Sequence, residues 1–250
     1  MNSQRLQGKV ALVTGASSGI GEATALALAA EGANICLVAR RQDRIAALAR
    51  KIEGIGREAV YIAADISEAQ QAKSAIEQTV TKWSRLDILV NNAGVMFLGP
   101  VDRSDMQDWQ TMININVLGL MYCTHGAVPI MKAQKSGHIV NISSVAGRVA
   151  RAGSGGYNAS KWAVGAFSEA LRQELCADNV RVTVVEPGMT ATELTDHIPL
   201  TDVREAAKNR AAQITPLRSE DVANAILYAV TQPPHVCINE ILLRPTEQQA

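Results

Sequence analysis

Short apolar runs alternate with longer helical patterns along almost the whole chain, and this alternation restricts the fold more than any other feature. Most of the runs are solidly apolar, as expected for parallel strands that are covered on both faces. Strands that alternate with helices indicate βαβ units with right-handed crossovers. The sequence therefore predicts a single α/β domain over residues 1–250, built on a doubly wound parallel sheet of about seven strands with helices on both faces.

The predicted elements follow directly from these runs. The expected strands are Val10–Thr14, Asn34–Ala39, Ala59–Ala63, Asp87–Asn91, Gly137–Ser143, Val180–Glu186 and Val236–Leu243. The expected helices are Gly19–Glu31, Gln42–Ile55, Glu68–Trp83, Met106–Gln134, Tyr157–Cys176 and Glu220–Thr231. The least regular stretch, residues 189–215, lies between the last two strands, and we interpret it as a candidate substrate lid.

A glycine-rich turn follows the first predicted strand and opens the first helix. It reads Gly15, Ala16, Ser17, Ser18, Gly19, Ile20 and Gly21, a G-x-x-x-G-x-G spacing. Glycines let the backbone turn tightly and approach a pyrophosphate, while the helix N-terminus offers free N–H groups to the anion. An ordinary βα turn is the alternative, because a glycine pattern alone is weak. Its position after the first strand favours a dinucleotide-binding site.

The end of the second predicted strand bears on the choice of dinucleotide. A site for NAD(H) usually has an acidic residue there, which accepts a hydrogen bond from the ribose 2′-hydroxyl. Here Ala39 is followed by Arg40 and Arg41, and a guanidinium suits a 2′-phosphate. NADP(H) is therefore favoured over NAD(H), although Arg41 could instead be a solvated residue at a helix start. Asp65 and Ile66 complete this part of the site, where Asp65 could accept from the adenine amino group or cap the next helix.

Tyr157 and Lys161 lie four residues apart at the start of a predicted helix. This spacing places the phenol and the ammonium on one face, one turn apart. A free phenol has a pKa of about 10, and a nearby cation favours its ionised form. We predict that Lys161, together with the positive nicotinamide of an oxidised cofactor, tunes Tyr157 toward neutral pH for proton exchange with an alcohol. The pair alone is a weak signal, because it also occurs on surface helices.

Further polar residues end the fourth and fifth predicted strands. Ser144 could hydrogen-bond a substrate oxygen opposite the tyrosine, and Asn92, Ala93 and Gly94 could line the cofactor groove. Asn116 falls inside a long predicted helix, where asparagine is unfavourable. We therefore predict a polar task for Asn116, such as holding a water in a proton path to the lysine.

Together these residues resemble the short-chain dehydrogenase/reductase family. The shared motifs, in chain order, are TGASSGIG, NNAG, the Asn116 region, ISS, Y-x-x-x-K and VEPG. The resemblance implies a Rossmann-type fold and a catalytic tetrad of Asn116, Ser144, Tyr157 and Lys161. Ser144 is preferred to Ser143 because it has the family's usual separation from the tyrosine.

The resemblance also implies contacts to the cofactor. Tyr157 and Lys161 belong to the cofactor site, and Lys161 binds the nicotinamide ribose hydroxyls. The turn of Pro187 and Gly188 contacts the nicotinamide, and Thr190 and Thr192 contact phosphates. The chain lacks the family's frequent D-G-G near its C-terminus. The C-terminal tail of this chain, together with the two arginines after the second strand, is similar to the branch of clavulanic-aldehyde reductases and 3-hydroxy-acid or serine dehydrogenases.

Composition restricts partners and compartment. The formal net charge is zero, with no run of Lys and Arg, so we expect no nucleic-acid partner. No apolar stretch is long enough to cross a membrane, and the polar residues 1–9 do not suit a signal peptide. The four cysteines form no C-x-x-C pair and are interpreted as buried thiols, and the four histidines show no ligand spacing. We expect a cytoplasmic protein without a metal site.

Other residues leave alternatives open. Arg148 and Arg151, between the serine and the tyrosine, could bind an anionic substrate or face solvent. Trp162 and Phe167 are expected to be packing residues. Small residues on the two long helices suit close contact, so we expect a homodimer, or a homotetramer, through that surface. His197 lies in the irregular segment and could touch substrate.

The sequence thus favours an NADP(H)-dependent oxidoreductase that transfers a hydride between nicotinamide and an alcohol, aldehyde or ketone, with Tyr157 as acid/base. A catalytically silent cofactor-binding regulator or scaffold is the alternative, which the complete tetrad disfavours. An epimerase or dehydratase on the same fold usually has an extended sugar-nucleotide domain, for which 250 residues leave no room. The motifs do not identify the substrate, because proteins of one fold act on many different substrates.

Overall fold

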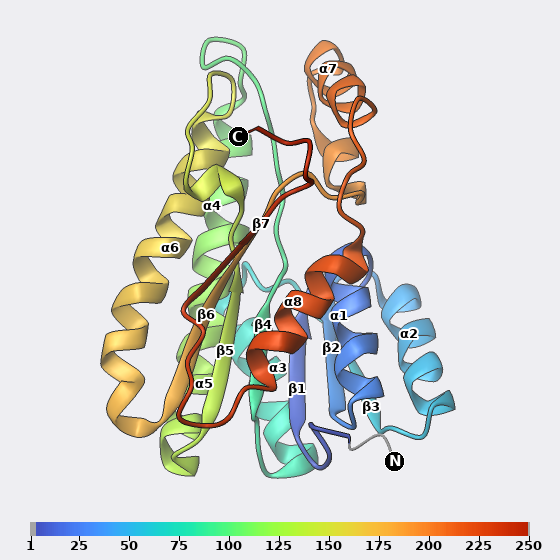
Figure 1. Cartoon of the computed structure of the whole chain (residues 1–250), viewed down its shortest axis with the longest axis vertical. Helices are drawn as coiled ribbons and strands as arrows, with labels where there is room; N and C mark the ends of the chain where they lie inside the picture. Colours follow the sequence, from blue (N-terminus) through green and yellow to red (C-terminus); the bar gives the residue numbers. More distant parts are fainter. Residues whose placement is uncertain (1–3, 250) are drawn as a thin grey trace.

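The strands form one parallel sheet in the order β3-β2-β1-β4-β5-β6-β7 (Figure 1). They are β1 (Val10–Thr14), β2 (Asn34–Ala39), β3 (Ala59–Ala63), β4 (Ile88–Asn91), β5 (Gly137–Ile142), β6 (Val180–Pro187) and β7 (Glu240–Leu243). This computed structural model describes residues 4–249. The strand order reverses beside β1, and in such sheets ligands bind beyond the carboxyl ends of the strands at that point. The predicted doubly wound α/β fold is confirmed.

Helices cover both faces of the sheet (Figure 1). They are α1 (Gly19–Ala30), α2 (Gln42–Gly54), α3 (Ala69–Trp83), α4 (Met106–Ile113), α5 (Leu120–Gln134), α6 (Gly155–Leu175), α7 (Thr201–Ala211) and α8 (Ser219–Val230). One core cluster joins the sheet to α1, α2 and α8, and a second joins it to α3, α5 and α6. Each covering helix therefore turns an apolar side toward the strands, as the sequence pattern predicts.

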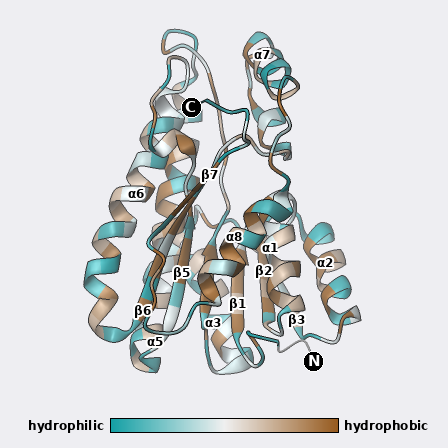
Figure 2. Cartoon of the chain, in the orientation of Figure 1, coloured by the Kyte–Doolittle hydropathy of each residue, from teal (hydrophilic) through white to brown (hydrophobic). Residues whose placement is uncertain are grey.

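The central strands are mostly apolar because both of their faces are covered (Figure 2). All residues of β1, β4 and β5 are buried, whereas β3 and β7 at the sheet edges are partly exposed. The strand predicted at 236–243 is shorter than expected, and β7 begins only at Glu240. The reason is a turn after α8, in which the Val236 N–H donates to the Pro233 carbonyl.

The long helix predicted over 106–134 contains a wider π-helical turn, η1 (Asn114–Gly119), between α4 and α5. Gly119 lies so close to the loop after β3 that a Cβ there would stand 2.7 Å from the Ile66 side chain. Hydrophobic periodicity could not reveal this turn, because the apolar pattern runs on through it. Such π turns occur frequently at functional sites.

Residues 189–215 lie beyond the carboxyl ends of the strands and include η4 (Glu193–His197) and α7 (Figure 1). We call this stretch the 189–215 segment. Helix α7 has no buried residue, in contrast to every helix that covers the sheet. The segment is thus partly helical, but α7 contributes no residue to the core.

Two packing predictions are wrong in part. Cys36 and Cys123 are buried, and burial raises the pKa of each thiol to about 12. Cys176 and Cys237 are exposed, because they lie in the turn after α6 and in the loop before β7. Trp162 was expected to pack in the interior, but it falls on the outer side of α6 and is 51% exposed.

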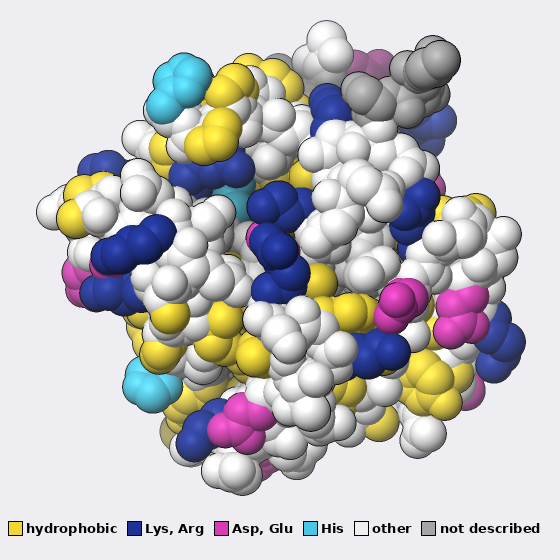
Figure 3. All heavy atoms as spheres, turned by 90° about the horizontal axis from the view of Figure 1, so that it is seen from below, with side chains coloured by type: hydrophobic (Ala, Val, Ile, Leu, Met, Phe, Trp, Pro, Cys, Tyr) yellow, Lys and Arg dark blue, Asp and Glu magenta, His cyan; other side chains and the backbone are white. Residues whose placement is uncertain are grey.

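The helices, the surface charges and the possible metal ligands bear on the expected partners. No helix within residues 4–249 is long and apolar enough to span a bilayer. The face shown in Figure 3 carries acidic and apolar side chains among its lysines and arginines. No group of three or more His, Cys, Asp or Glu side chains in the described part of the chain is arranged to hold a metal ion.

Candidate active site

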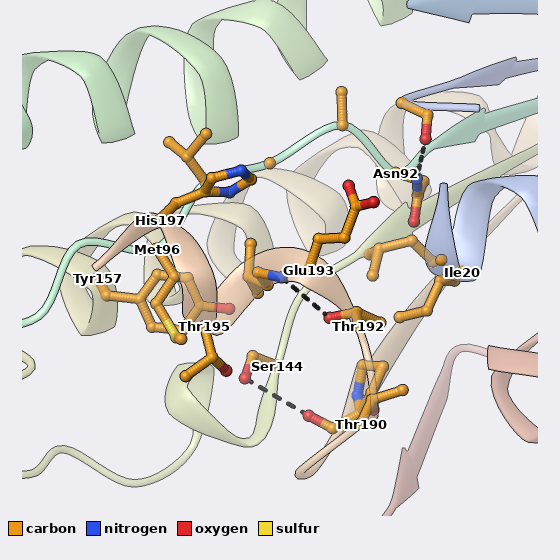
Figure 4. A pocket seen from close by; sticks show the side chains of 18 of the residues that line it. Ile20, Asn92, Met96, Ser144, Tyr157, Thr190, Thr192, Glu193, Thr195 and His197 are labelled. Atoms are coloured by element: carbon orange, nitrogen blue, oxygen red, sulfur yellow. Dashed lines mark hydrogen bonds between the residues drawn. The ribbon is translucent and has the colours of Figure 1, made fainter. Parts of the chain in front are cut away.

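A cavity of about 480 Å³ opens at the carboxyl ends of the central strands and takes in most of the predicted site (Figure 4). Its volume lies in the range of ligand pockets. The predicted residues that line it are Gly15, Ser17, Ser18, Gly19, Ile20, Arg40, Arg41, Asp65, Ile66, Asn92, Ala93, Gly94, Ser144, Tyr157, Lys161, Pro187, Gly188, Thr190 and Thr192. Among the predicted residues, Gly21 and Asn116 are not part of this lining.

The glycine turn depends on the absence of side chains at three positions. A Cβ on Gly15, which has φ +64°, would stand 2.7 Å from the Ala93 backbone. A Cβ on Gly21 would stand 2.4 Å from the Gly15 carbonyl oxygen. Gly21 therefore packs behind the turn, and its contact with cofactor stays a prediction. Gly19, with φ +59°, faces the cavity and Thr192.

The N-terminus of α1 opens into the same cavity. Ser18 precedes the helix, but its side chain makes no capping hydrogen bond. The Ser18 hydroxyl instead accepts from Arg41 Nη2 at 2.7 Å. The first N–H groups of a helix carry partial positive charge and suit an anion. The turn and the bare helix end therefore fit the pyrophosphate of a dinucleotide.

Arg40 and Arg41, which follow β2, make different contacts. Arg41 donates through Nε and Nη2 to the Ser17 hydroxyl at 3.1 and 2.9 Å, so it is not the solvated residue that the sequence allowed. Arg40 is two-thirds exposed and lies 3.8 Å from Asp65. Asp65 Oδ1 accepts from Ser67, and α3 begins four residues later with Glu68 at its N-cap. Capping by Asp65 is therefore wrong, and its contact with adenine stays a prediction.

A hydrogen-bond network fixes the end of β4 against the glycine turn. The Thr14 hydroxyl accepts from the backbone N–H groups of Asn92 and Ala93 at 3.0 and 3.1 Å. The Asn92 side-chain amide donates to the carbonyls of Thr14 and Gly15. Asn92 thus holds two strand ends together rather than projecting freely into the groove.

Ser144, Tyr157 and Lys161 line the other end of the cavity. Figure 4 shows the first two of them. Ser144 follows β5, and a hydrogen bond joins it to Tyr157. Lys161 Nζ lies 5.8 Å from the centre of the Tyr157 ring and donates to the Ile142 carbonyl at 2.9 Å. The neighbouring Ser143 hydroxyl donates to the Lys161 carbonyl, so it supports α6 while Ser144 faces the tyrosine.

Burial controls the charges of this group. It raises the pKa of Tyr157 to about 12, although the hydrogen bond with Ser144 acts in the opposite direction. It also lowers the pKa of Lys161 to about 8. For the protein alone, burial has the largest influence on the Tyr157 pKa, and the tuning of Tyr157 by Lys161 stays a prediction. The contribution of an oxidised nicotinamide stays a prediction.

Asn116 lies in the π turn, behind the cavity wall. Its Oδ1 accepts from the Val95 N–H at 2.8 Å, and its Nδ2 donates to the Val95 carbonyl and the Ser160 hydroxyl. A Cβ on Gly94 would contact both Asn116 Oδ1 and Lys161 Nζ, at 3.2 and 3.7 Å. Asn116 therefore fixes the loop after β4 close to the lysine, and its role in a water path remains a prediction.

The turn after β6 carries the next predicted residues. Pro187 accepts a 3.4 Å hydrogen bond from the Ser144 hydroxyl through its carbonyl. Gly188 is closed in by Gln248, whose Oε1 also accepts from the Met189 N–H at 2.8 Å. No motif or spacing pointed to a residue from the C-terminal end in the site. Gln248 nevertheless lines the cavity.

Arg148 does not face substrate. Its Nε donates to both Glu186 carboxylate oxygens at 2.7 and 2.9 Å, and its Nη2 contacts Glu240. These two acids raise the pKa of Arg148 and anchor the loop after Ser144 to β6 and β7. Arg151, in contrast, lines the cavity.

Several lining residues were missed by the sequence reasoning. They include Met96, Leu98, Met189, Glu193, Thr195 and Arg210. Most of them belong to the 189–215 segment or to the loop after β4, which have no regular apolar pattern. His197, which the sequence did single out, also lines the cavity.

Comparison with known proteins agrees with this geometry. The family model described as short chain dehydrogenase matches residues 9–202. An uncharacterised oxidoreductase of Staphylococcus saprophyticus is 38% identical over 247 residues, which cover 96% of this chain and 97% of that protein. A glycine betaine reductase of Emericella nidulans is 42% identical over 247 residues, which cover 97% of this chain but 19% of that larger protein.

Solved structures extend the likeness to the whole fold. The closed form of a serine dehydrogenase complexed with NADP⁺ is 34% identical, with a TM-score of 0.88 and coverage of 96% of both chains. A short-chain dehydrogenase/reductase from Burkholderia phymatum in complex with NAD is 28% identical, with a TM-score of 0.87 and coverage of 95% of this chain and 89% of that one. The chain is therefore an oxidoreductase of the short-chain dehydrogenase family.

Proposed function

We propose that the protein is an NADP(H)-dependent oxidoreductase that interconverts an alcohol and a carbonyl compound, with Tyr157 as the acid/base. The supporting observation is one cavity that has the glycine turn at one end and the Ser144–Tyr157–Lys161 group at the other. A dinucleotide laid along it would bring its pyrophosphate to α1 and its nicotinamide to the tyrosine.

NADPH, when bound, supplies a hydride to the substrate carbon, and NADP⁺ accepts one in the reverse direction. During reduction, the Tyr157 hydroxyl donates its proton to the substrate oxygen, while the Ser144 hydroxyl hydrogen-bonds that oxygen. A pKa of about 12 keeps Tyr157 protonated at neutral pH, which suits donation. Lys161 stabilises the phenolate that remains until a proton returns.

Replacing Tyr157 with Phe tests the acid/base role. The ring still fills its site, so the fold and cofactor binding should persist while kcat falls about 10³-fold. The measurement is NADPH oxidation with a panel of aldehydes, ketones and short oxo acids, alongside an NADPH fluorescence titration. A variant that keeps full turnover would remove Tyr157 from the mechanism.

The preference for NADP(H) rests on Arg40 and Arg41. Arg40 is free to swing toward a 2′-phosphate, since its pair with Asp65 is long and its side chain is two-thirds exposed. Arg41 already lies against the serines of the turn. Arg40→Asp should weaken NADPH binding about tenfold or more and leave NADH nearly unchanged. An unaltered ratio of the two dissociation constants would contradict this assignment.

The substrate end favours a small polar molecule. Arg151 and Arg210 line the cavity and can supply positive charge, which suits an anionic substrate such as a hydroxy acid. The serine dehydrogenase relative supports the same class. Arg210→Gln should raise KM for an oxo acid and leave KM for a neutral ketone unchanged. Equal effects on both substrates would count against an anion site.

We also propose that α6 forms part of a homodimer interface. Trp162 is half exposed, and the small residue Gly165 has open space around its Cα on the same helix. Trp162→Arg should shift the chain toward monomer in sedimentation experiments. A monomeric wild-type protein would contradict the interface.

A further inference from the structure

Glu193 connects the 189–215 segment to the adenosine end of the candidate site. Its Oε2 accepts from Arg41 Nη1 at 2.7 Å, and its Oε1 accepts from Arg44 Nη1 at 2.6 Å. Arg44 and Arg41 lower the pKa of Glu193 to about 2, so the carboxylate is charged at any ordinary pH. One acid at the start of η4 is thus shared by two cations at the start of α2.

The contact continues from Arg41 to the glycine turn. The same guanidinium that binds Glu193 donates to the hydroxyls of Ser17 and Ser18. The neighbouring Thr192 lies close to Gly19, because its methyl group would stand 3.2 Å from a Cβ on that glycine. Residues on both sides of this bridge line the cavity, and Figure 4 shows Glu193 next to Thr192 in that lining. A dinucleotide in the groove would therefore be crossed by a bridge of side chains.

We propose that Glu193 is a positioning residue whose ion pairs with Arg41 and Arg44 clasp the 189–215 segment over the bound dinucleotide, so that opening of the clasp limits cofactor release. This inference rests on the proposed function. The three side chains are 39–46% exposed, so each pair is screened by water and contributes little alone. Such a contact can open repeatedly, which suits a gate that must admit and release cofactor.

The first experiment measures release of NADPH and of NADH from wild-type protein and from Glu193→Gln. Each reduced cofactor is displaced by excess NADP⁺ and followed by stopped-flow fluorescence. Because the clasp holds the same segment over either dinucleotide, both dissociation rates should rise, by roughly five- to tenfold. Arg44→Gln, which removes one pair and lies outside the cavity lining, should show a smaller part of the same increase.

The second experiment varies the ionic strength, so that the ion pairs of the wild type are weakened without a substitution. Raising ionic strength from about 50 mM to about 500 mM weakens exposed ion pairs. The NADH release rate of the wild type should then approach that of Glu193→Gln, whereas the variant should respond little. NADH is the better probe here because it lacks the 2′-phosphate. Glu58→Gln is the matched control, since Glu58 forms an exposed pair with Lys82 at the opposite end of the sheet.

A third measurement uses the protein without cofactor. Hydrogen exchange of the amides in residues 193–197 should accelerate in Glu193→Gln, while the melting temperature stays within a few degrees of wild type. Unchanged exchange and unchanged release would each overturn the clasp. Tighter binding of NADPH alone would also overturn it, because it would show that Glu193 competes with the 2′-phosphate for Arg41. A wild type that binds neither cofactor would refute the proposed function, and hydrogen exchange would still test the clasp.

Discussion

The two sides of the cavity are built in different ways. The side formed by the strand ends and α6 is held by buried contacts, such as the Thr14–Asn92 network and the enclosed Lys161. The opposite side, the 189–215 segment, is held largely at its surface, by the Glu193 pairs and by Arg103 bound to Asp202. Buried polar contacts cost far more to break than exposed ones. The first side therefore holds the candidate catalytic groups in place, and the second side is the one suited to open for ligands to enter and leave.

The two sides of the cavity also contribute unequally to the stability of the fold. The first side contains charged groups that are stable only with their partners, as with Glu186, which is 2% exposed beside Arg148. The second side has α7 without a buried residue, so its ordering adds little to global stability. Local opening is expected where few apolar contacts are buried. The 189–215 segment should therefore open without unfolding the sheet.

The largest effect should come from Arg148→Met. It leaves the Glu186 carboxylate buried without its cation, which should lower the free energy of unfolding by about 3–5 kcal/mol. Urea unfolding followed by circular dichroism measures this change. Arg172→Met removes an exposed pair with Glu169 and should change the free energy of unfolding far less. Equal losses in the two variants would erase the contrast between buried and exposed pairs.

A pH experiment probes the buried ammonium. The folded pKa of Lys161 is about 8, below its usual value near 10.5, so the unfolded chain binds the extra proton more tightly. The contribution of Lys161 to stability is therefore present above about pH 10.5 and is lost as the pH falls through about 8. The difference in unfolding free energy between wild type and Lys161→Met should change by up to about 3 kcal/mol over this window. A pH-independent difference would mean that water reaches the ammonium.

The strand-end side was largely predictable from sequence, because local pattern and local chemistry determine it. The apolar run ending at Thr14 and the glycines that follow place the turn, and four-residue spacing places Tyr157 over Lys161. What the sequence missed there is burial depth, which decides the direction of the tyrosine pKa. The position of Gly21 behind the turn likewise depends on packing, which the glycine spacing alone does not show.

The other side could not be predicted, because its contacts join residues far apart in the chain. Glu193 lies 152 residues from Arg41, and no apolar periodicity marks an exposed acid. The same limit applies on the first side to the bond from Arg148 to Glu186, which spans 38 residues, because Arg148 could equally have bound substrate. Residue type and spacing indicate chemistry only where one helix or one turn brings the groups together.

Gly21→Ala tests how tightly the glycine turn is packed. The added Cβ would stand 2.4 Å from the Gly15 carbonyl oxygen, and backbone must move to relieve the overlap. We expect a loss of about 2 kcal/mol in stability, together with weaker NADPH binding. Gly54→Ala is the control, because a Cβ there meets nothing within 4 Å and should be neutral or slightly stabilising. Unchanged stability in Gly21→Ala would show that the glycine turn is packed more loosely than this 2.4 Å distance indicates.

The smallest effect on stability should come from Arg103→Met. Arg103 donates to both Asp202 oxygens at 2.8 Å and joins the loop after β4 to the start of α7. Because both side chains are about half exposed or more, the free energy of unfolding should change very little. Hydrogen exchange of residues 201–211 should nevertheless accelerate, since α7 has no buried residue to retain it. Lys208→Met is the matched control, because its pair with Asp196 lies within the segment and should leave the docking of α7 unchanged. A loss of several kcal/mol in Arg103→Met would show that the 189–215 segment belongs to the cooperative core, and the two sides of the cavity would then no longer differ in kind.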